Sequence, residues 1–224
     1  MKVVLVPGFT QTARSWAPVI ERLPGAIDAT PLDVPSDLDF VATALALGHS
    51  GGAGTYVGYS LGGRLCLRLA LERPDLVERL VLVSASPGIA DASARAARRE
   101  ADERWARAIE HDGADAFLER WLAQPLFASL PPEAAALHAR VHDPAVLTHG
   151  LRVLGQGAQA PLWDRLGELT MPATLVAGAL DEKYVDIAMA MNDRIPDANV
   201  SVFGGVGHAV HLEQPFTIVH VVGA

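Results

Sequence analysis

The chain alternates six short apolar segments with stretches of helix-forming residues, and this rhythm constrains its fold more than any other feature. The apolar segments span Lys2–Pro7, Ala26–Val34, Thr55–Tyr59, Arg79–Ser84, Ala173–Gly178 and Ala198–Gly204. Continuous apolar segments of this length are typical of strands covered on both faces, whereas a half-exposed strand alternates apolar and polar residues. Strands that alternate with helices predict an α/β fold, with a mostly parallel sheet flanked by helices.

The length and charge of the chain narrow the class of protein. Its 224 residues suffice for one domain with an insertion, but not for two ordinary domains in series. A formal charge of −8 disfavours a nucleic-acid partner, because proteins that bind the phosphate backbone usually carry a basic surface. Pro7 cuts short the apolar N-terminal segment, and no stretch approaches the ~18 apolar residues of a membrane span. We therefore expect neither a signal peptide nor a membrane anchor.

The cysteine and histidine content indicates the compartment and disfavours a metal site. The single cysteine, Cys66, lies in the apolar run LCLRLAL and cannot form an intramolecular disulfide. We expect it in the core, which suits a reducing compartment and predicts a cytoplasmic protein. The eight histidines show no ligand spacing such as H-E-x-x-H, so we expect no metal, and no other cofactor is expected. The oligomeric state stays open, and a homo-oligomer is compatible with the sequence.

The strand rhythm stops between residues 86 and 172, which are rich in Ala, Arg, Glu and Leu. We expect helices over Asp91–Gly113, Ala114–Ala123, Pro131–Val141 and Pro144–Gly155. An insertion between two strands of a parallel sheet lies beyond the strand ends, where ligands bind in open α/β sheets. The prediction is a core of residues 1–85 and 173–224 with a helical lid of residues 86–172. The alternative is a helical domain unrelated to any site.

A G-x-S-x-G motif places Ser60 between Gly58 and Gly62, where an apolar segment meets a predicted helix. The motif alone is weak, but the setting of strand, turn and helix is typical of a nucleophile elbow, which exposes a serine on a sharp turn. A serine that merely caps a helix is the alternative. That alternative explains the serine but not both glycines.

A nucleophilic serine needs an imidazole partner and an acid that orients it. His208 lies in a glycine-rich stretch after the last predicted strand, and Asp181 follows the strand Ala173–Gly178. The order Ser60, Asp181, His208 is that of the triad in α/β-hydrolases. We therefore predict these three residues as the catalytic triad. The weaker candidates are His211 for the base and Glu182 or Asp186 for the acid.

Backbone N–H groups are expected to stabilise negative charge that develops during the reaction. Leu61, directly after the serine, supplies one donor. Phe9, in the loop after the first strand, supplies the other, because Gly8 allows the backbone to approach a ligand closely and Pro7 has no N–H.

Four longer motifs resemble one branch of the α/β-hydrolase superfamily, the 2-succinyl-6-hydroxy-2,4-cyclohexadiene-1-carboxylate (SHCHC) synthases of menaquinone biosynthesis. They are GYSLGGRL, WLAQPLFASL, GALDEKYVDIA and GVGHAVHLEQP, and the resemblance runs from the first strand through His211. It implies a lyase: the triad removes a proton from a cyclohexene substrate, and pyruvate leaves from an enol ether as a ring diene forms. Ser60 would then act as a base relayed through His208, without an acyl-enzyme.

The resemblance also implies a substrate with several carboxylates, and therefore cations near the serine. Arg64 and Lys183 match basic residues of the family's motifs. The lid helix offers Arg95, Arg98 and Arg99, spaced so that Arg95 shares a helix face with Arg98 or Arg99, and Arg98 is the nearest match to the family's lid arginine. The expected substrate-binding residues are Arg64, Arg95, Arg98, Trp121, Gln124 and Lys183. The alternatives are lid arginines paired with Glu100, Asp102 and Glu103, and a tryptophan that belongs to the core of the lid.

Several departures from the family pattern keep a second function open. The first loop reads VPGF where many relatives have His-Gly, Leu122 follows the lid tryptophan where well-studied members have tyrosine, and residues 32–40 lack the family's Asp-x-Pro-Gly-His-Gly-x-Ser turn. The alternative function is a serine carboxylesterase that hydrolyses small acyl esters through an acyl-enzyme. A third hypothesis, a ligand-binding fold without catalysis, is disfavoured by the intact triad. The expected partner is a small anionic or ester molecule.

Overall fold

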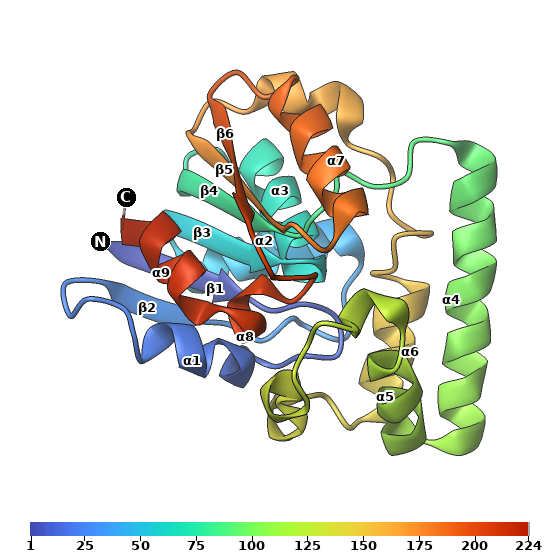
Figure 1. The fold of residues 1–224 in the computed structure, drawn as a ribbon. Helices are drawn as coiled ribbons and strands as arrows, with labels where there is room; N and C mark the ends of the chain where they lie inside the picture. Colours follow the sequence, from blue (N-terminus) through green and yellow to red (C-terminus); the bar gives the residue numbers. More distant parts are fainter. Residues whose placement is uncertain (224) are drawn as a thin grey trace.

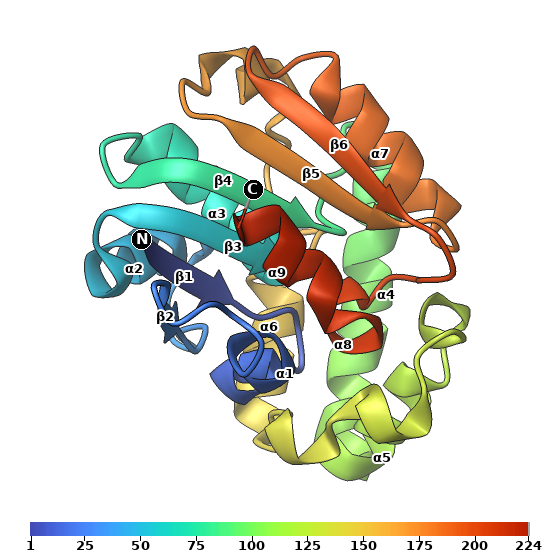
Figure 2. The ribbon, with the colours of Figure 1, turned by 60° about the vertical axis from the view of Figure 1, so that its left-hand side comes forward.

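The computed structural model describes residues 1–223 and contains one six-stranded sheet in which all neighbouring strands are parallel. The strand order is β2-β1-β3-β4-β5-β6, which Figure 2 shows nearly face on. The strands are β1 (Lys2–Val6), β2 (Asp28–Pro31), β3 (Gly54–Tyr59), β4 (Val77–Val83), β5 (Ala173–Gly178) and β6 (Ala198–Phe203). The predicted α/β fold with its parallel sheet is confirmed, and each of the six predicted segments overlaps one strand.

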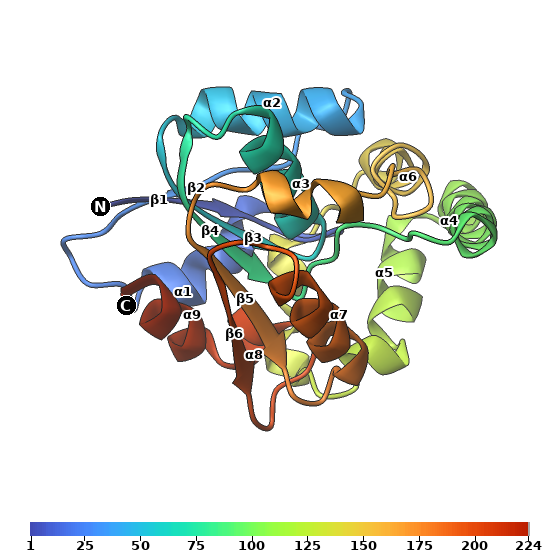
Figure 3. The same ribbon diagram turned by 90° about the horizontal axis from the view of Figure 1, so that it is seen from above.

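Helices cover both faces of the sheet because successive strand residues point to opposite sides. In β1, Val3 and Leu5 pack into one apolar cluster and Val4 and Val6 into the other. The first face carries α1 (Ala17–Ile20), α8 (Val210–Glu213) and α9 (Pro215–Gly223). The second face carries α2 (Phe40–Gly51), α3 (Leu61–Glu72) and α7 (Glu182–Asn192). Figure 3 shows α2 and α3 on one side of the sheet and α1 and α9 on the other.

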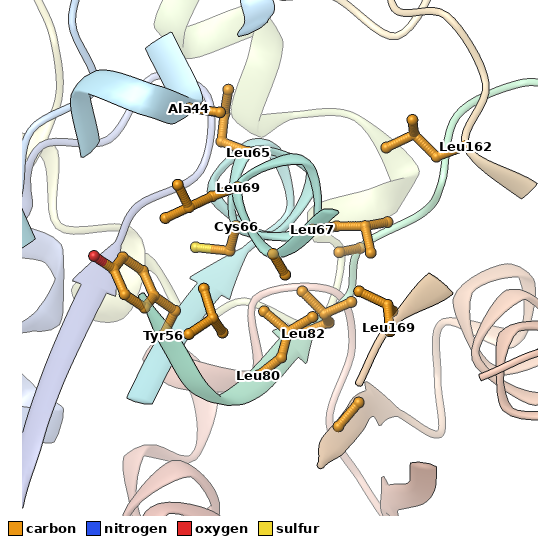
Figure 4. Packing of buried hydrophobic residues seen from close by; sticks show 14 of the residues in the cluster. Ala44, Tyr56, Leu65, Cys66, Leu67, Leu69, Leu80, Leu82, Leu162 and Leu169 are labelled. Atoms are coloured by element: carbon orange, nitrogen blue, oxygen red, sulfur yellow. The ribbon is translucent and has the colours of Figure 1, made fainter. Parts of the chain in front are cut away.

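Helix α3 is the centre of the larger apolar cluster, and almost every residue of it is buried. Figure 4 shows its leucines packed among side chains of β3, β4 and the segment before β5. Cys66 lies in this cluster with 1% exposure, so the prediction of a core cysteine is confirmed. Burial raises the pKa of its thiol, which therefore stays protonated.

The segment between β4 and β5 forms a helical layer beside the sheet. Its helices are α4 (Ala92–Asp112), α5 (Ala114–Leu122) and α6 (Pro144–Arg152). Asp91 caps α4 by accepting a hydrogen bond from the Ala94 N–H (2.7 Å), and the helix ends at Gly113 with a φ of 87°. Figure 1 shows α4 as a long helix along one side, with α5 and α6 between it and the rest of the chain.

The predicted helix over Pro131–Val141 is wrong. Two short 3₁₀ turns occupy this segment, separated by Ala136 in the left-handed conformation with a φ of 49°. Tertiary contacts replace the helical hydrogen bonds here: Thr12 N–H donates to the Ala139 carbonyl, and Val141 N–H donates to the Thr10 carbonyl (both 2.8 Å). The segment therefore pairs with the loop after β1. The 3₁₀ turns of the chain are Ala13–Trp16, Pro125–Phe127, Pro132–Ala135, Leu137–Ala139 and Trp163–Glu168.

The strand order creates a crevice at the carboxyl ends of β1 and β3, the position at which open α/β folds bind ligands. From β1 the chain moves to the edge strand β2 and then returns to β3 on the other side of β1. The carboxyl ends of β1 and β3 therefore lie at a topological switch point. The loop after β1 and the turn after β3 both start there. Across residues 1–223, no helix is long and apolar enough to cross a membrane.

Candidate active site

Ser60 lies on a strained turn between β3 and α3. Its φ of 50° and ψ of −107° are unusual for a residue with a side chain, and its hydroxyl caps no backbone N–H of α3. A Cβ at Gly58 would lie 2.5 Å from the Gly62 backbone, and a Cβ at Gly62 would collide with the carbonyl groups of Val6 and Pro7. Both glycines are thus required for the turn, and the alternative of a simple capping serine does not fit.

Ser60, His208 and Asp181 form a continuous chain of hydrogen bonds. His208 Nδ1 lies 2.6 Å from Asp181 Oδ2, and His208 Nε2 lies 3.3 Å from Ser60 Oγ. The carboxylate can only accept, so Nδ1 carries a proton and Nε2 is free to accept the Ser60 proton. Asp181 is 8% exposed and His208 2%, so water competes little for either bond. The three residues follow β3, β5 and β6, whose carboxyl ends share one edge of the sheet.

The weaker triad candidates lie elsewhere. His211 is fully buried and packs between the rings of Trp16 and Tyr59, with ring centroids 4.6 Å and 4.3 Å away. Burial, together with the nearby charges of Arg140 and His208, lowers its pKa to about 3. Its Nε2 lies 3.2 Å from Gln11 Oε1. The alternative acids Glu182 and Asp186 are exposed on α7.

The two predicted anion donors flank the serine. A Cβ at Gly8 would lie 3.5 Å from the Ser60 Cβ, so the loop that carries Phe9 passes directly beside Ser60. Leu61 begins α3, and its N–H belongs to the first turn, where backbone donors have no intrahelical acceptor. Gln11 Oε1 accepts a hydrogen bond from the Gly8 N–H (3.3 Å) and holds the loop. Phe9 and Leu61 both line the cavity described next.

A cavity of about 270 Å³ opens over Ser60 and His208, between the sheet and the inserted segment of residues 86–172, for which we keep the name lid. Its aromatic wall comes partly from the lid, where the Trp121 ring lies 5.2 Å from the Phe9 ring and 5.9 Å from the Trp105 ring. Trp121 thus packs in the apolar core of the lid and also forms part of the cavity wall. The polar lining residues besides the triad are Arg64, Arg98, Asp102, Gln124, Gln156 and Tyr184, with the hydroxyl of Tyr59 also on a lining residue.

Arg64 brings a buried positive charge to the cavity. Its guanidinium donates to Gln159 Oε1 (2.7 Å) and to the Leu154 carbonyl (2.8 Å), and it lies over the ring of Phe40. Burial lowers its pKa to about 10, so the side chain is still a cation at neutral pH. Within residues 1–223, no carboxylate forms a salt bridge with it. The cavity therefore attracts an anion at this side.

Arg98 reaches the cavity from the lid helix α4. Its Nε donates to Asp102 Oδ1 (2.8 Å) one helical turn away, and its Nη1 donates to Gln156 Oε1 (3.3 Å). Asp102 is 2% exposed, and its Oδ2 has no hydrogen-bond partner among the described residues. Arg98 thus lines the cavity, as expected of a substrate-binding residue, and also forms a salt bridge with Asp102, as the alternative predicts.

Two of the six predicted substrate-binding residues lie outside the cavity. Arg95 donates to the carbonyls of Ile89 (2.8 Å) and Ala90 (3.0 Å), which holds its side chain at the start of α4. Lys183 is exposed on α7, with its Nζ 5.6 Å from the ring centroid of Tyr184. The lining residues are Arg64, Arg98, Trp121 and Gln124. Gln124 also donates to the Trp121 carbonyl (2.9 Å), and Leu122 is not part of the lining.

Sequence reasoning missed three polar residues of the lining, Asp102, Gln156 and Tyr184. Tyr184 follows Asp181 by three positions, so helical spacing could have placed it beside the triad. Asp102 follows Arg98 by four positions and was considered only as a surface partner. Gln156 lies after α6 in an irregular turn, where no periodicity points to it.

The similarity to known proteins agrees with this geometry. Residues 3–221 match the Alpha/beta hydrolase family. The chain belongs to this family. Within it, a Bacillus subtilis (strain 168) protein named putative SHCHC synthase is 32% identical over 95% of this chain and 85% of its own length. An SHCHC synthase of Salmonella newport (strain SL254) is 29% identical over 97% of this chain and 90% of its own length.

Solved structures of the family extend the comparison. MenH from S. aureus superposes with a TM-score of 0.93 at 28% identity, covering 99% of this chain and 91% of that one. A thermophilic esterase from Thermogutta terrifontis has a TM-score of 0.83 at 20% identity, covering 100% and 88% of the two chains, which shows the shared fold alone. The predicted resemblance to SHCHC synthases is confirmed.

Proposed function

We propose that this protein is a lyase of the SHCHC synthase type, which eliminates pyruvate from 2-succinyl-5-enolpyruvyl-6-hydroxy-3-cyclohexene-1-carboxylate. The observation that carries the proposal is the cavity itself. It joins the Ser60–His208 pair to two arginines and holds one acid, Asp102, which is paired with Arg98. An anionic substrate supplies the missing negative charge. The relatives at 32% and 29% identity carry the name of this activity.

The geometry supports a proton abstraction by Ser60. His208 Nε2 accepts the Ser60 proton, and Ser60 Oγ takes a proton from the ring carbon of the substrate. The electrons of the broken C–H bond form a new double bond to the neighbouring alkene carbon, the existing ring double bond shifts by one position towards the carbon that bears the enolpyruvyl oxygen, and the C–O bond at that carbon breaks. The enolpyruvate that leaves takes the proton held on His208 at its methylene carbon and becomes pyruvate, while Ser60 keeps the proton removed from the ring. Asp181 stabilises the imidazolium, and the N–H groups of Phe9 and Leu61 stabilise oxygen charge.

Pyruvate release tests the proposal directly. A lactate dehydrogenase coupled assay with the cyclohexene substrate should show a rate well above the spontaneous elimination, because the triad supplies a base within the cavity. The Ser60→Ala variant should lower this rate by about 10³-fold or more. A rate that is equal in wild type and Ser60→Ala would contradict the proposal. Circular dichroism of both proteins controls for folding.

A serine carboxylesterase is the second candidate, because a hydrogen-bonded serine, histidine and aspartate beside two backbone donors also fit acyl transfer. The same preparations distinguish the two. A burst of p-nitrophenol from p-nitrophenyl acetate, lost in Ser60→Ala, together with no pyruvate release, would favour the esterase. Pyruvate release without a burst favours the lyase. The charged cavity wall supports the lyase, since a neutral ester leaves Arg64 uncompensated.

The compartment and the partner follow from the same proposal. The substrate is a small anionic molecule that fits a cavity of about 270 Å³. A cytoplasmic location is supported by the unpaired, buried thiol of Cys66, which suits a reducing environment.

A further inference from the structure

Tyr184 forms part of the cavity wall next to the triad. It lies in the first turn of α7, where its N–H donates to the Asp181 carbonyl (2.9 Å), and its side chain is buried. Its ring packs edge-on against His208, with centroids 4.6 Å apart. The packing fixes the ring, so the hydroxyl has a defined position in the cavity wall.

The hydroxyl of Tyr184 accepts a hydrogen bond and keeps its own proton unpaired. Gln156 Nε2 donates to it (2.9 Å), while Gln156 Oε1 accepts from Arg98 Nη1 (3.3 Å). A guanidinium can only donate, so the amide of Gln156 must turn its oxygen to Arg98 and its NH₂ group to Tyr184. Among residues 1–223, no acceptor receives the proton of this hydroxyl.

A buried donor without an acceptor is costly, and most such groups in proteins are paired. Burial raises the pKa of Tyr184, so the group stays a protonated donor at neutral pH. Because Tyr184 lines the cavity, a ligand in the cavity can provide the acceptor.

The charges around Tyr184 indicate the chemistry of that acceptor. Arg64 and Arg98 both lie close enough to act on the hydroxyl electrostatically. Asp102 forms its salt bridge with Arg98 and acts on Arg64 only at a distance, while the direct hydrogen-bond partners of Arg64 are the neutral Gln159 side chain and the Leu154 carbonyl. A carboxylate placed here balances the charge of Arg64 and accepts the proton of Tyr184 in a charge-assisted hydrogen bond.

We propose that the Tyr184 hydroxyl donates a hydrogen bond to a carboxylate of the bound substrate, on the side of the cavity that holds Arg64 and Arg98. The contact makes Tyr184 a specificity residue for anionic substrates. The proposal deepens the lyase function and rests on it.

The Tyr184→Phe variant tests the contact, with Tyr56→Phe as its matched control. Tyr56 is also buried, but its hydroxyl donates to the Gly52 carbonyl (2.7 Å) at the other end of β3. KM and kcat are measured for pyruvate release. Calorimetry gives the Kd of 2-succinylbenzoate, a stable dicarboxylate that carries the ring and succinyl carboxylates of the substrate, but not the enolpyruvyl carboxylate, on an aromatic ring. Tyr184→Phe should raise KM and this Kd about tenfold and change kcat less than about twofold. Tyr56→Phe should change neither constant.

The outcomes separate the contact from the proposed function. The dimethyl ester of the probe should lose less than about twofold in affinity in Tyr184→Phe, because a neutral ester carbonyl forms only a weak hydrogen bond and no charge-assisted one. An unchanged KM together with an unchanged Kd for the dicarboxylate would overturn the contact, as would a loss confined to kcat. If wild type releases no pyruvate but its binding of the dicarboxylate weakens tenfold in Tyr184→Phe, the lyase is refuted and the contact stands. If folded wild type binds no dicarboxylate and Tyr184→Phe leaves KM unchanged, the contact is also refuted.

Discussion

At the scale of single residues, Asp181 and Asp186 lie five positions apart but have different surroundings. The Asp181 carboxylate lies 2.6 Å from the His208 imidazole, as the predicted triad requires, whereas Asp186 is exposed on α7. Asp181→Asn should lower kcat for pyruvate release by about 10²- to 10⁴-fold, since an amide no longer stabilises the imidazolium. His208→Ala should cost more, and Asp186→Asn should stay within about twofold of wild type. If Asp186→Asn proved the damaging change, the acid would be wrongly assigned.

Among the polar residues at or near the cavity, the three triad residues could be predicted from the sequence, but the positions of the lid arginines could not. Ser60, Asp181 and His208 could be predicted because each follows a strand, and strand ends converge at one edge of a parallel sheet. The arginines on α4 could only be placed on a helix face. Hydrogen bonds to two loop carbonyls then decide that Arg95 stays outside the cavity, and such contacts leave no trace in residue spacing.

At the scale of secondary structure elements, the elbow depends on close approach between β1 and α3. Gly62→Ala should abolish activity and lower Tm by several degrees, because the new Cβ collides with the carbonyl groups that follow β1. Gly25→Ala is the matched control, since a Cβ at Gly25 meets no atom within 4 Å and its φ is ordinary. Thermal unfolding by circular dichroism measures both. A Gly62→Ala variant with wild-type Tm and activity would contradict this account of the turn.

The strands could be predicted from the sequence, but the absence of a helix over Pro131–Val141 could not. A buried parallel strand needs apolar residues on both faces, so its sequence is distinctive. The Pro131–Val141 segment has helix-forming composition, but its backbone pairs with Thr10 and Thr12 in a loop more than a hundred residues earlier. Arg140 Nη1 also donates to Thr10 Oγ1 (2.6 Å), which strengthens that pairing. Local propensity is outweighed there by contacts that no local pattern encodes.

At the scale of the whole molecule, His211 links stability to pH. Burial is the main reason that its folded-state pKa lies near 3, against about 6.5 when exposed. As pH falls below 6.5, the unfolded chain binds a proton that the folded chain refuses, so stability falls. The contribution should reach about 2 kcal/mol between pH 7 and pH 5, a window above the range in which carboxylates titrate.

Urea unfolding at the two pH values measures this effect. His211→Asn removes the titrating group, so the variant should lose less stability than wild type between pH 7 and pH 5, whatever its absolute stability. His49→Asn is the control, because His49 is exposed on α2 and forms no side-chain hydrogen bond or ion pair among residues 1–223. An equal pH dependence in wild type and His211→Asn would rule out this role.

The contacts of Phe9 determine which segments can be exchanged between two proteins of this fold in a chimera. Its loop passes beside Ser60, and its ring packs against Phe117 and Trp121 of the lid, with centroids 6.2 Å and 5.2 Å away. The lid is contiguous in sequence, yet it shares an interior with a loop near the N-terminus. A chimera that exchanges residues 86–172 alone cuts through that shared interior. The unit that must be exchanged is therefore discontinuous in sequence. Residues 7–12 and the lid have to be transferred together if Phe9 is to keep its packing against Phe117 and Trp121.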